Sequence, residues 1–440
     1  MQAFVEKNPY TAGFEPLKAE LRSEGEALRA LREKALERFD ELGFPTTKVE
    51  AWRNTNVSPI AQAAFPLAAA AGAVTLEELE PHLYEGTERL VFVDGFFVPG
   101  LSSLELPPGG VALSLAEAKK LYPERVGAHL GRNLRFENQA FAALNTALHR
   151  DGLFFFLPKN TVVERPIQVL CVAASGRTAA YPRHLIVLED NSQATLVESY
   201  VGLGDEEPYF TCPVTEVSLG ANAVLDHYKI QREGLAAYHV AVQQSWQDRD
   251  STLRSHSISI GGALVRNDLN GYLDGEGVSC TLNGLYLVDG KQHVDNHMRM
   301  DHAKPNGYSH ELYKGVLNGS GRAVFNGLIH VHPDAQKTDA VQSNRNLLLS
   351  KNALAYSNPQ LEIFADDVRC THGSTIGQLD DDAVFYLRSR GIGEEAARSL
   401  LTYAFASDIV ERIKVEGVRR DLEEYLFRRL PRGEVVRQAV

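Results

Sequence analysis

The stretch "GEGVSCTLNGLYL" at residues 275–287 is echoed by "GSGRAVFNGLIHV" at residues 319–331, and both carry an Asn-Gly pair inside an apolar run. A shorter form, "NGYL", begins at Asn270. Repetition of one strand-like unit is typical of coils that stack and bury apolar side chains against their neighbours. The repeat therefore predicts a parallel β-helix, with coils of roughly 20-odd residues and about ten coils in the stack.

The repeats lie inside a long region, residues 151–377, whose residue pattern is similar throughout. Short runs rich in Val, Ile, Leu and Tyr alternate there with Gly, Asn and Asp, and a sustained helical pattern is missing. A β-sandwich is the alternative architecture, but its strands would carry hairpin signals every 8–12 residues or so, and such signals are sparse. We therefore expect a mainly β protein whose β-helix core spans residues 151–377.

Residues 1–150 read as a mostly helical N-terminal domain. Apolar residues recur at spacings of three and four over residues 17–42, which predicts one amphipathic helix. Ser114 and Glu117 have the spacing of a capping box at a second helix, and a third is expected at residues 137–150. Asp94-Gly95 lies between two apolar runs and predicts a tight hairpin turn.

Residues 378–440 read as a C-terminal helical domain. An apolar stripe runs from Ala397 to Ile413, and another helix is expected in "VRRDLEEYLFRRL". Helices that follow a solenoid can cap its open end against edge pairing, or present a surface to a partner.

Composition excludes several classes of function. The formal charge of −12 comes without a basic run, which disfavours nucleic acid as a partner. The N-terminus "MQAFVEKNPY" lacks a signal-peptide pattern and no apolar tract is long enough to span a membrane, so we expect a cytoplasmic protein without a membrane partner. The chain has no GxxxxGK[ST] loop, GxSxG elbow or HExxH helix, so neither ATP hydrolysis nor the catalysis typical of those motifs is expected.

The candidate site is "ADDVRCTHGSTIG", residues 365–377. If residues 361–372 form one strand, then Asp366, Cys370 and His372 share a face, and Asp367 points the other way. Sulfur and imidazole donors suit an iron–sulfur cluster, zinc or copper. Two such donors are an incomplete set, and a cysteine packed under a loop beside a histidine bound to the backbone is the structural alternative.

The other cysteines and histidines gave weaker signals. Cys171, Cys212 and Cys280 are far apart without a CxxC pair, so we expect buried free thiols.

Six of the fourteen histidines fall between residues 293 and 332. Because no thiol or carboxylate completes a recognisable ligand set with them, a structural or interface role is favoured. Those histidines are His293, His297, His302, His310, His330 and His332.

Longer segments carry a resemblance to a known family. The runs "SHELYKGVLNGSGRAVFNGLIHV" (309–331), "DAQKTDA" (334–340), "NRNLLLS" (344–350) and above all "PQLEIFADDVRCTHGSTIGQLDDDAVFYLRSRGI" (359–392) resemble the SufB/SufD family of the SUF iron–sulfur cluster assembly machinery, in its SufD form. The likeness extends upstream to "DGLFFFLPKN" (151–160) and more loosely to "KVEAWRNTNV" (48–57).

The resemblance implies a right-handed parallel β-helix flanked by helical domains, and a non-catalytic scaffold subunit of an ATP-driven complex. It implies pairing with a SufB paralogue and binding of the ABC-type ATPase SufC through the C-terminal helices. His372 then occupies the family's histidine position beside Cys370, and both would contribute to a transient iron–sulfur cluster shared with the partner. A reduced flavin on the assembled complex and a homodimer of the isolated chain are further implications.

Two alternatives stay open at the level of sequence. The first is a SufB-like paralogue of the same complex, which would share its fold and partners. The second is a β-helix polysaccharide lyase or hydrolase, for which Asp366 and Asp367 are the candidate carboxylates.

Overall fold

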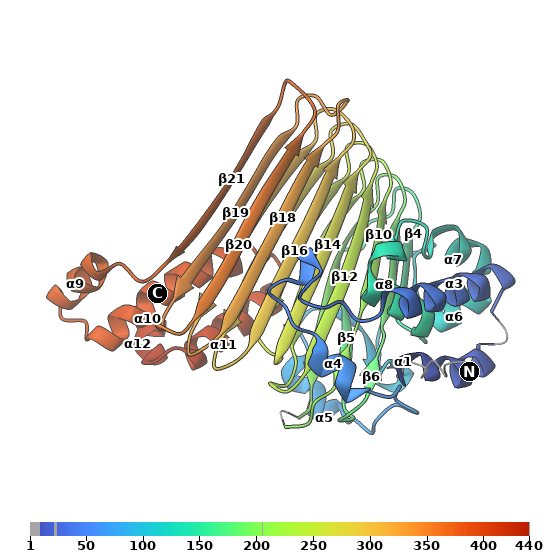
Figure 1. The fold of residues 1–440 in the computed structure, drawn as a ribbon, viewed down its shortest axis with the longest axis horizontal. Helices are drawn as coiled ribbons and strands as arrows, with labels where there is room; N and C mark the ends of the chain where they lie inside the picture. Colours follow the sequence, from blue (N-terminus) through green and yellow to red (C-terminus); the bar gives the residue numbers. More distant parts are fainter. Residues whose placement is uncertain (1–8, 22–23, 205, 440) are drawn as a thin grey trace, which may run out of the picture.

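The computed structural model describes residues 9–21, 24–204 and 206–439, and Figure 1 shows a stack of coils with helices formed by the N-terminal and C-terminal parts of the chain. Two parallel sheets form the core, and the chain alternates between them as it winds. Sheet A, in spatial order, contains β20 (Leu354–Ile363), β18 (Arg322–Val331), β16 (His293–His302), β14 (Leu264–Leu273), β12 (Tyr238–Gln247), β10 (Val214–Leu219), β7 (Arg183–Leu188), β4 (Leu153–Leu157) and β3 (Val111–Ser114). The short strand β9 (Phe210–Thr211) also pairs with β12, and β6 (Ala179–Ala180) pairs with β9. Sheet B contains β2 (Phe96–Phe97), β1 (Glu88–Val93), β5 (Ile167–Ala173), β8 (Gln193–Gly202), β11 (Val224–Arg232), β13 (Thr252–Ser259), β15 (Ser279–Val288), β17 (Tyr308–Leu317), β19 (Asp339–Leu348) and β21 (Arg369–Gly377).

The strand register confirms the predicted class, a mainly β chain with a parallel solenoid core and helical ends. Leu264 pairs with His293, and His293 pairs with Arg322, so these coils are 29 residues apart. The core has about eight turns. The coil is at the long end of the expected 20-odd residues, and the expected ten coils were too many, because each coil holds one strand of each sheet, up to ten residues long, and two turns.

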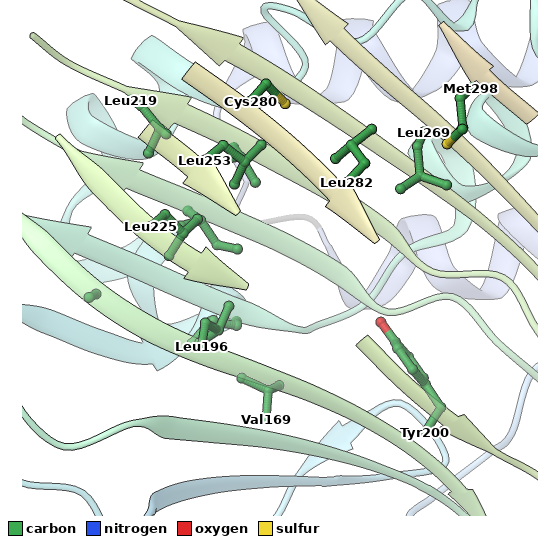
Figure 2. Packing of buried hydrophobic residues seen from close by; sticks show 14 of the residues in the cluster. Val169, Leu196, Tyr200, Leu219, Leu225, Leu253, Leu269, Cys280, Leu282 and Met298 are labelled. Atoms are coloured by element: carbon green, nitrogen blue, oxygen red, sulfur yellow. The ribbon is translucent and has the colours of Figure 1, made fainter. Parts of the chain in front are cut away.

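Apolar ladders fill the space between the two sheets. Leu225, Leu253 and Cys280 occupy paired positions on β11, β13 and β15, and Leu269 pairs with Met298 on sheet A (Figure 2). All five side chains are buried in one cluster. Because every coil repeats this alternation of inward and outward residues, neighbouring coils bury one another's apolar side chains.

Gly284 of the Asn-Gly repeat, and Gly315 on the next coil, have the same packing cause. Gly284 on β15 pairs with Tyr313 on β17, and Tyr286 on β15 pairs with Gly315 on β17. A Cβ atom at Gly284 would lie 2.2 Å from the Tyr313 ring, and one at Gly315 would lie 2.0 Å from the Tyr286 ring. Each glycine therefore makes room for an aromatic ring from the neighbouring coil, which fixes the register of the two strands.

The N-terminal region differs from its prediction in one place. Instead of one helix over residues 17–42, α2 (Phe14–Glu20) ends before Gly25, and α3 (Glu26–Leu42) begins after it, with Gly25 in an extended conformation. The described part of the chain does not include residues 1–8 or residues 22 and 23. Further short helices are α1 (Pro9–Ala12), α4 (Ser58–Ala63), α5 (Leu76–Leu79) and α7 (Pro123–His129).

The expected hairpin turn was confirmed, and one of the two hydrogen bonds of the expected capping box forms. Asp94 and Gly95 both have positive φ and join β1 to β2, and the Ser114 side chain accepts a hydrogen bond from the Glu117 amide at the start of α6 (Leu115–Leu121). The third expected helix is α8 (Ala140–Leu148), which packs on the outer face of sheet A. Strands β1 and β3 join sheets B and A, so residues before 151 also extend the stack.

The C-terminal helices are α9 (Asp381–Ser389), α10 (Glu394–Val410), α11 (Glu416–Arg429) and α12 (Gly433–Ala439). Ile409 and Leu422 from these helices pack on Ile230, Ile258 and Leu285 from the outer face of sheet B. The helices therefore cover the side of the solenoid, and of the two roles considered from the sequence, capping of the open end does not apply. Figure 1 shows β20 and β21 at the free edge of the stack. Among the described helices, none combines the length and the apolar character needed to cross a membrane.

Candidate functional site

Cys370 and His372 lie on β21, the last strand of sheet B. Cys370 pairs with Ala340 and His372 pairs with Gln342, so both occupy the alternate positions whose counterparts on β19 are buried. The expectation that they share a face of a strand is confirmed. The expected strand over residues 361–372 was wrong, since β20 ends at Ile363 and β21 begins at Arg369.

Asp366 and Asp367 belong to the turn between these strands. The Asp367 carboxylate forms an ion pair with Lys337 at 2.6 Å, and its carbonyl accepts a hydrogen bond from the Lys337 amide. Lys337 has a positive φ of 61°. Asp367 therefore stabilises the adjacent turn of the previous coil, and Asp366 does not lie on the strand that carries Cys370 and His372.

The environments of the two candidate ligands differ. Cys370 is half-buried against the small apolar cluster that contains Ile329, Val331 and Ala340. Burial raises the pKa of the Cys370 thiol, against the opposing effect of a hydrogen bond with the Ala340 backbone. His372 is exposed, beside a groove that also contains Arg345, Asp408 and Arg412. The imidazole is thus accessible to a metal or a partner, whereas the thiol is held mainly in its protonated form.

Two interior residues lie behind His372 on the neighbouring strands. Gln342 on β19 is the register partner of His372, and it donates a hydrogen bond to Glu311 on β17 at 2.7 Å. Burial raises the pKa of Glu311 to about 7. The sequence analysis did not identify Glu311 and Gln342. The coil length would have identified them, because residues 311, 342 and 372 are each about one coil apart.

The strands that carry the site form an open edge. Neither β20 nor β21 has a partner on its outer side in the described structure, so each presents unpaired backbone N–H and C=O groups. Large apolar side chains are also exposed on these strands and their connecting turn. They are Leu354, Tyr356, Ile363, Phe364 and Ile376. An apolar surface along an unpaired strand edge is typical of a surface that another chain covers.

The remaining cysteines match the expectation of buried free thiols. Cys171 and Cys280 belong to the main core, and Cys212 packs under α8. Burial raises the pKa of all three thiols.

Four of the six clustered histidines make polar contacts typical of structural residues. The contacts, each given as the shortest distance, join His293 to Thr55 at 2.9 Å, His297 to Asp295 at 3.2 Å, His302 to Ser309 at 2.8 Å and His310 to Tyr308 at 3.2 Å. The other two, His330 and His332, lie beside Asp301. The interpretation that no carboxylate completes a ligand set was therefore wrong for this pair, because the 29-residue coil brings Asp301 next to His330.

Comparison with known proteins covers nearly the whole chain. Residues 171–405 match the family model described as "SUF system FeS cluster assembly, SufBD core domain", and residues 6–169 match "SufBD protein N-terminal region". The chain is 33% identical over 406 residues to the iron–sulfur cluster assembly protein SufD of Escherichia coli (strain K12), covering 90% of this chain and 92% of the relative. It is 33% identical to an iron–sulfur cluster assembly SufBD family protein of Synechocystis, over 89% of each chain. It is 28% identical to SufD of Bacillus subtilis (strain 168), over 92% of this chain and 94% of the relative.

Proposed function

Because this chain belongs to the SufBD family of SUF-system iron–sulfur cluster assembly proteins, we propose that it is a SufD-like scaffold subunit. In this proposal His372, with Cys370 in a lesser role, contributes to a nascent cluster held jointly with a SufB-like paralogue. The observation that carries the proposal is the position of both residues on β21, at the unpaired edge of the solenoid.

The chemistry of the donor set supports a shared site. Cβ atoms two residues apart on a strand are about 6 to 7 Å apart, which is too far for a compact tetrahedral site built from this strand alone. A second chain placed along the open edge would supply the missing thiolate and carboxylate ligands. His372 is the more available donor here, because burial keeps the Cys370 thiol protonated. The cluster is then cargo that forms and leaves.

We also propose that the chain binds an ABC-type ATPase of the SufC kind and lacks ATPase activity of its own. The sequence has no phosphate-binding loop, so the energy must come from another subunit. The C-terminal helices supply a docking surface: Phe385 and Tyr386 on α9 are 70% and 55% exposed. Aromatic side chains of this kind are common anchors at protein interfaces.

The alternatives have less support. Two of the relatives are named SufD, which favours the SufD form over a SufB-like paralogue. The lyase or hydrolase hypothesis depended on Asp366 and Asp367, and Asp367 is engaged with Lys337 in a turn. We assign no described residue to a flavin, so the flavin forms no part of the proposal.

Co-purification tests the assembly. The tagged chain, co-expressed with SufB-like and SufC-like proteins, should retain both, and the complex should contain iron and sulfide. Ile376→Lys places a charge on the edge strand β21, where Ile376 is 47% exposed, and should release the SufB-like protein. Val162→Lys, a substitution at an equally exposed residue outside the terminal coil, is the matched control. If the Ile376→Lys chain retains the paralogue as wild type does, the proposed pairing edge is wrong.

The same pair of variants tests a homodimer of the isolated chain. If the isolated chain dimerises through this edge, Ile376→Lys should convert it to a monomer in sedimentation velocity, and Val162→Lys should leave the dimer intact. A dimer that survives Ile376→Lys would use another surface.

A further inference from the structure

A group of three ligand-type side chains lies on the outer face of sheet A, away from Cys370 and His372. Asp301 is on β16, His330 is its register partner on β18, and His332 follows two residues later, just beyond the end of that strand. One ligand-type atom from each of the three lies within 4.8 Å of the other two. Asp301 is buried and the two histidines are partly exposed, so the group opens to solvent on one side.

The hydrogen bonds around the group leave one ring nitrogen of each histidine available to bind a metal ion. His330 Nδ1 lies 2.9 Å from Oε2 of Glu362 on β20. An ionised carboxylate can only accept, so Nδ1 donates, and a neutral His330 keeps the lone pair on Nε2 for a metal. His332 Nε2 is buried, and it has no hydrogen-bond partner among the described residues.

The carboxylate is also held in place. Arg299 donates two hydrogen bonds to Asp301, each 2.8 Å long. A ligand carboxylate that is oriented by a second residue, and a ligand histidine that donates its other N–H to a carboxylate, are regular features of metal sites.

The distance between two of the ligand atoms suits a small ion. Metal–nitrogen and metal–oxygen bonds of about 2.0 to 2.1 Å place two ligands of a tetrahedral ion about 3.3 Å apart. His332 Nε2 is already 3.6 Å from Asp301 Oδ1. The His332 side chain is 34% exposed, so it can adjust by rotation without disturbing the core.

We propose that Asp301, His330 and His332 bind one divalent transition-metal ion and leave its remaining coordination positions open to water or an external ligand. Two imidazoles and one carboxylate suit Fe²⁺, Co²⁺ or Zn²⁺, whereas Ca²⁺ and Mg²⁺ require mostly oxygen ligands. The site does not depend on the proposed function. It lies on the opposite sheet from His372, and its ligands all come from this chain.

Metal titration of the full chain tests the site. We use a Cys370→Ser/His372→Ala background, which removes the candidate cluster ligands, and strip metal with a chelator before adding Co²⁺ or Zn²⁺. One equivalent of Co²⁺ should bind and produce visible absorption bands, and Zn²⁺ should displace it. His330→Ala and His332→Ala should each abolish this stoichiometric binding, while His310→Ala, on the outer face of sheet B, should not change it.

A second variant separates ligation from folding. Glu362 is 49% exposed and would not be a ligand, so Glu362→Gln should leave the fold intact and weaken Co²⁺ binding by about 10 to 100-fold. Absence of stoichiometric binding in the parent protein, or binding that survives His330→Ala and His332→Ala together, would overturn the proposal. In that case Asp301 and His332 form only an ion pair.

Discussion

Gln342 donates a hydrogen bond from Nε2 to Oε2 of Glu311 at 2.7 Å, and it is the only side-chain partner of that carboxyl in the described structure. Glu311 is fully buried, and Oε1 of each residue has no partner among the described groups. Burial raises the pKa of Glu311 to about 7, so the folded protein keeps this carboxyl protonated at pH values where the unfolded chain ionises it.

The first prediction concerns stability and pH. Between about pH 4.5 and pH 7 the folded state binds a proton at Glu311 that the unfolded state has released, so stability falls as pH rises through this window. The free energy of unfolding falls by an amount of the order of 3 kcal/mol across this window because of Glu311. Glu311→Gln should therefore be more stable than wild type at pH 8, and this advantage should shrink at pH 5. Urea unfolding at both pH values measures it, with exposed Glu164→Gln as the control. An advantage that is the same at both pH values would contradict the raised pKa.

The second prediction concerns His372. His372→Ala removes an exposed imidazole and no core packing, so the fold and the complex with the paralogue should be unchanged. The iron and sulfide content of the purified complex should fall by about tenfold or more, as expected for loss of a ligand. Cys370→Ser should cost less, because burial keeps that thiol protonated. Clusters that form in the His372→Ala complex at the wild-type rate and yield would make His372 a structural histidine.

The third prediction concerns the ATPase. Deletion of residues 394–440 removes α10, against which α9 packs, and should therefore abolish SufC binding. The deletion leaves Phe385 and Tyr386 in the chain, however, and it uncovers the apolar face of sheet B that contains Ile230, Ile258 and Leu285, so a folded surface variant is the better test. Phe385→Ala/Tyr386→Ala should weaken SufC binding by about tenfold or more, because both rings are exposed on α9. Calorimetric titration measures the affinity, and Leu235→Ala, an equally exposed apolar residue elsewhere, is the control. Unchanged affinity in the double variant would move the docking surface off α9.

The fourth prediction concerns Gly284 of the Asn-Gly repeat. Gly284→Ala places a methyl group 2.2 Å from the Tyr313 ring, so the ring or the strand must shift, and the protein should lose about 1 to 3 kcal/mol of stability. Gly373→Ala on β21 meets no atom within 4 Å and should be nearly neutral. Urea unfolding compares the two variants, and Tyr313→Leu in the Gly284→Ala background should recover part of the loss. Equal stability of Gly284→Ala and wild type would mean that the glycine is not required by the ring.

Local features were predictable where neighbouring residues decide them. The Asp94-Gly95 hairpin depends on two positive φ values, and the start of α6 depends on the Ser114 hydroxyl and the Glu117 amide three residues later. The shared face of Cys370 and His372 follows from the two-residue period of a strand. The prediction of one helix over residues 17–42 was wrong because the apolar period continues across Gly25. The extended backbone of Gly25 separates α2 from α3.

The sequence by itself determined a repeating β architecture with helical ends, the family, and the residues Cys370 and His372 as candidates for the site. Only the tertiary structure decided which distant residues meet. The coil length brings Asp301 to His330 and places Gln342 between Glu311 and His372, and the apolar outer face of sheet B draws the C-terminal helices to the side of the stack. The physical reason is that contacts between coils depend on register across about 29 residues, whereas sequence periodicity reports contacts only over a few residues.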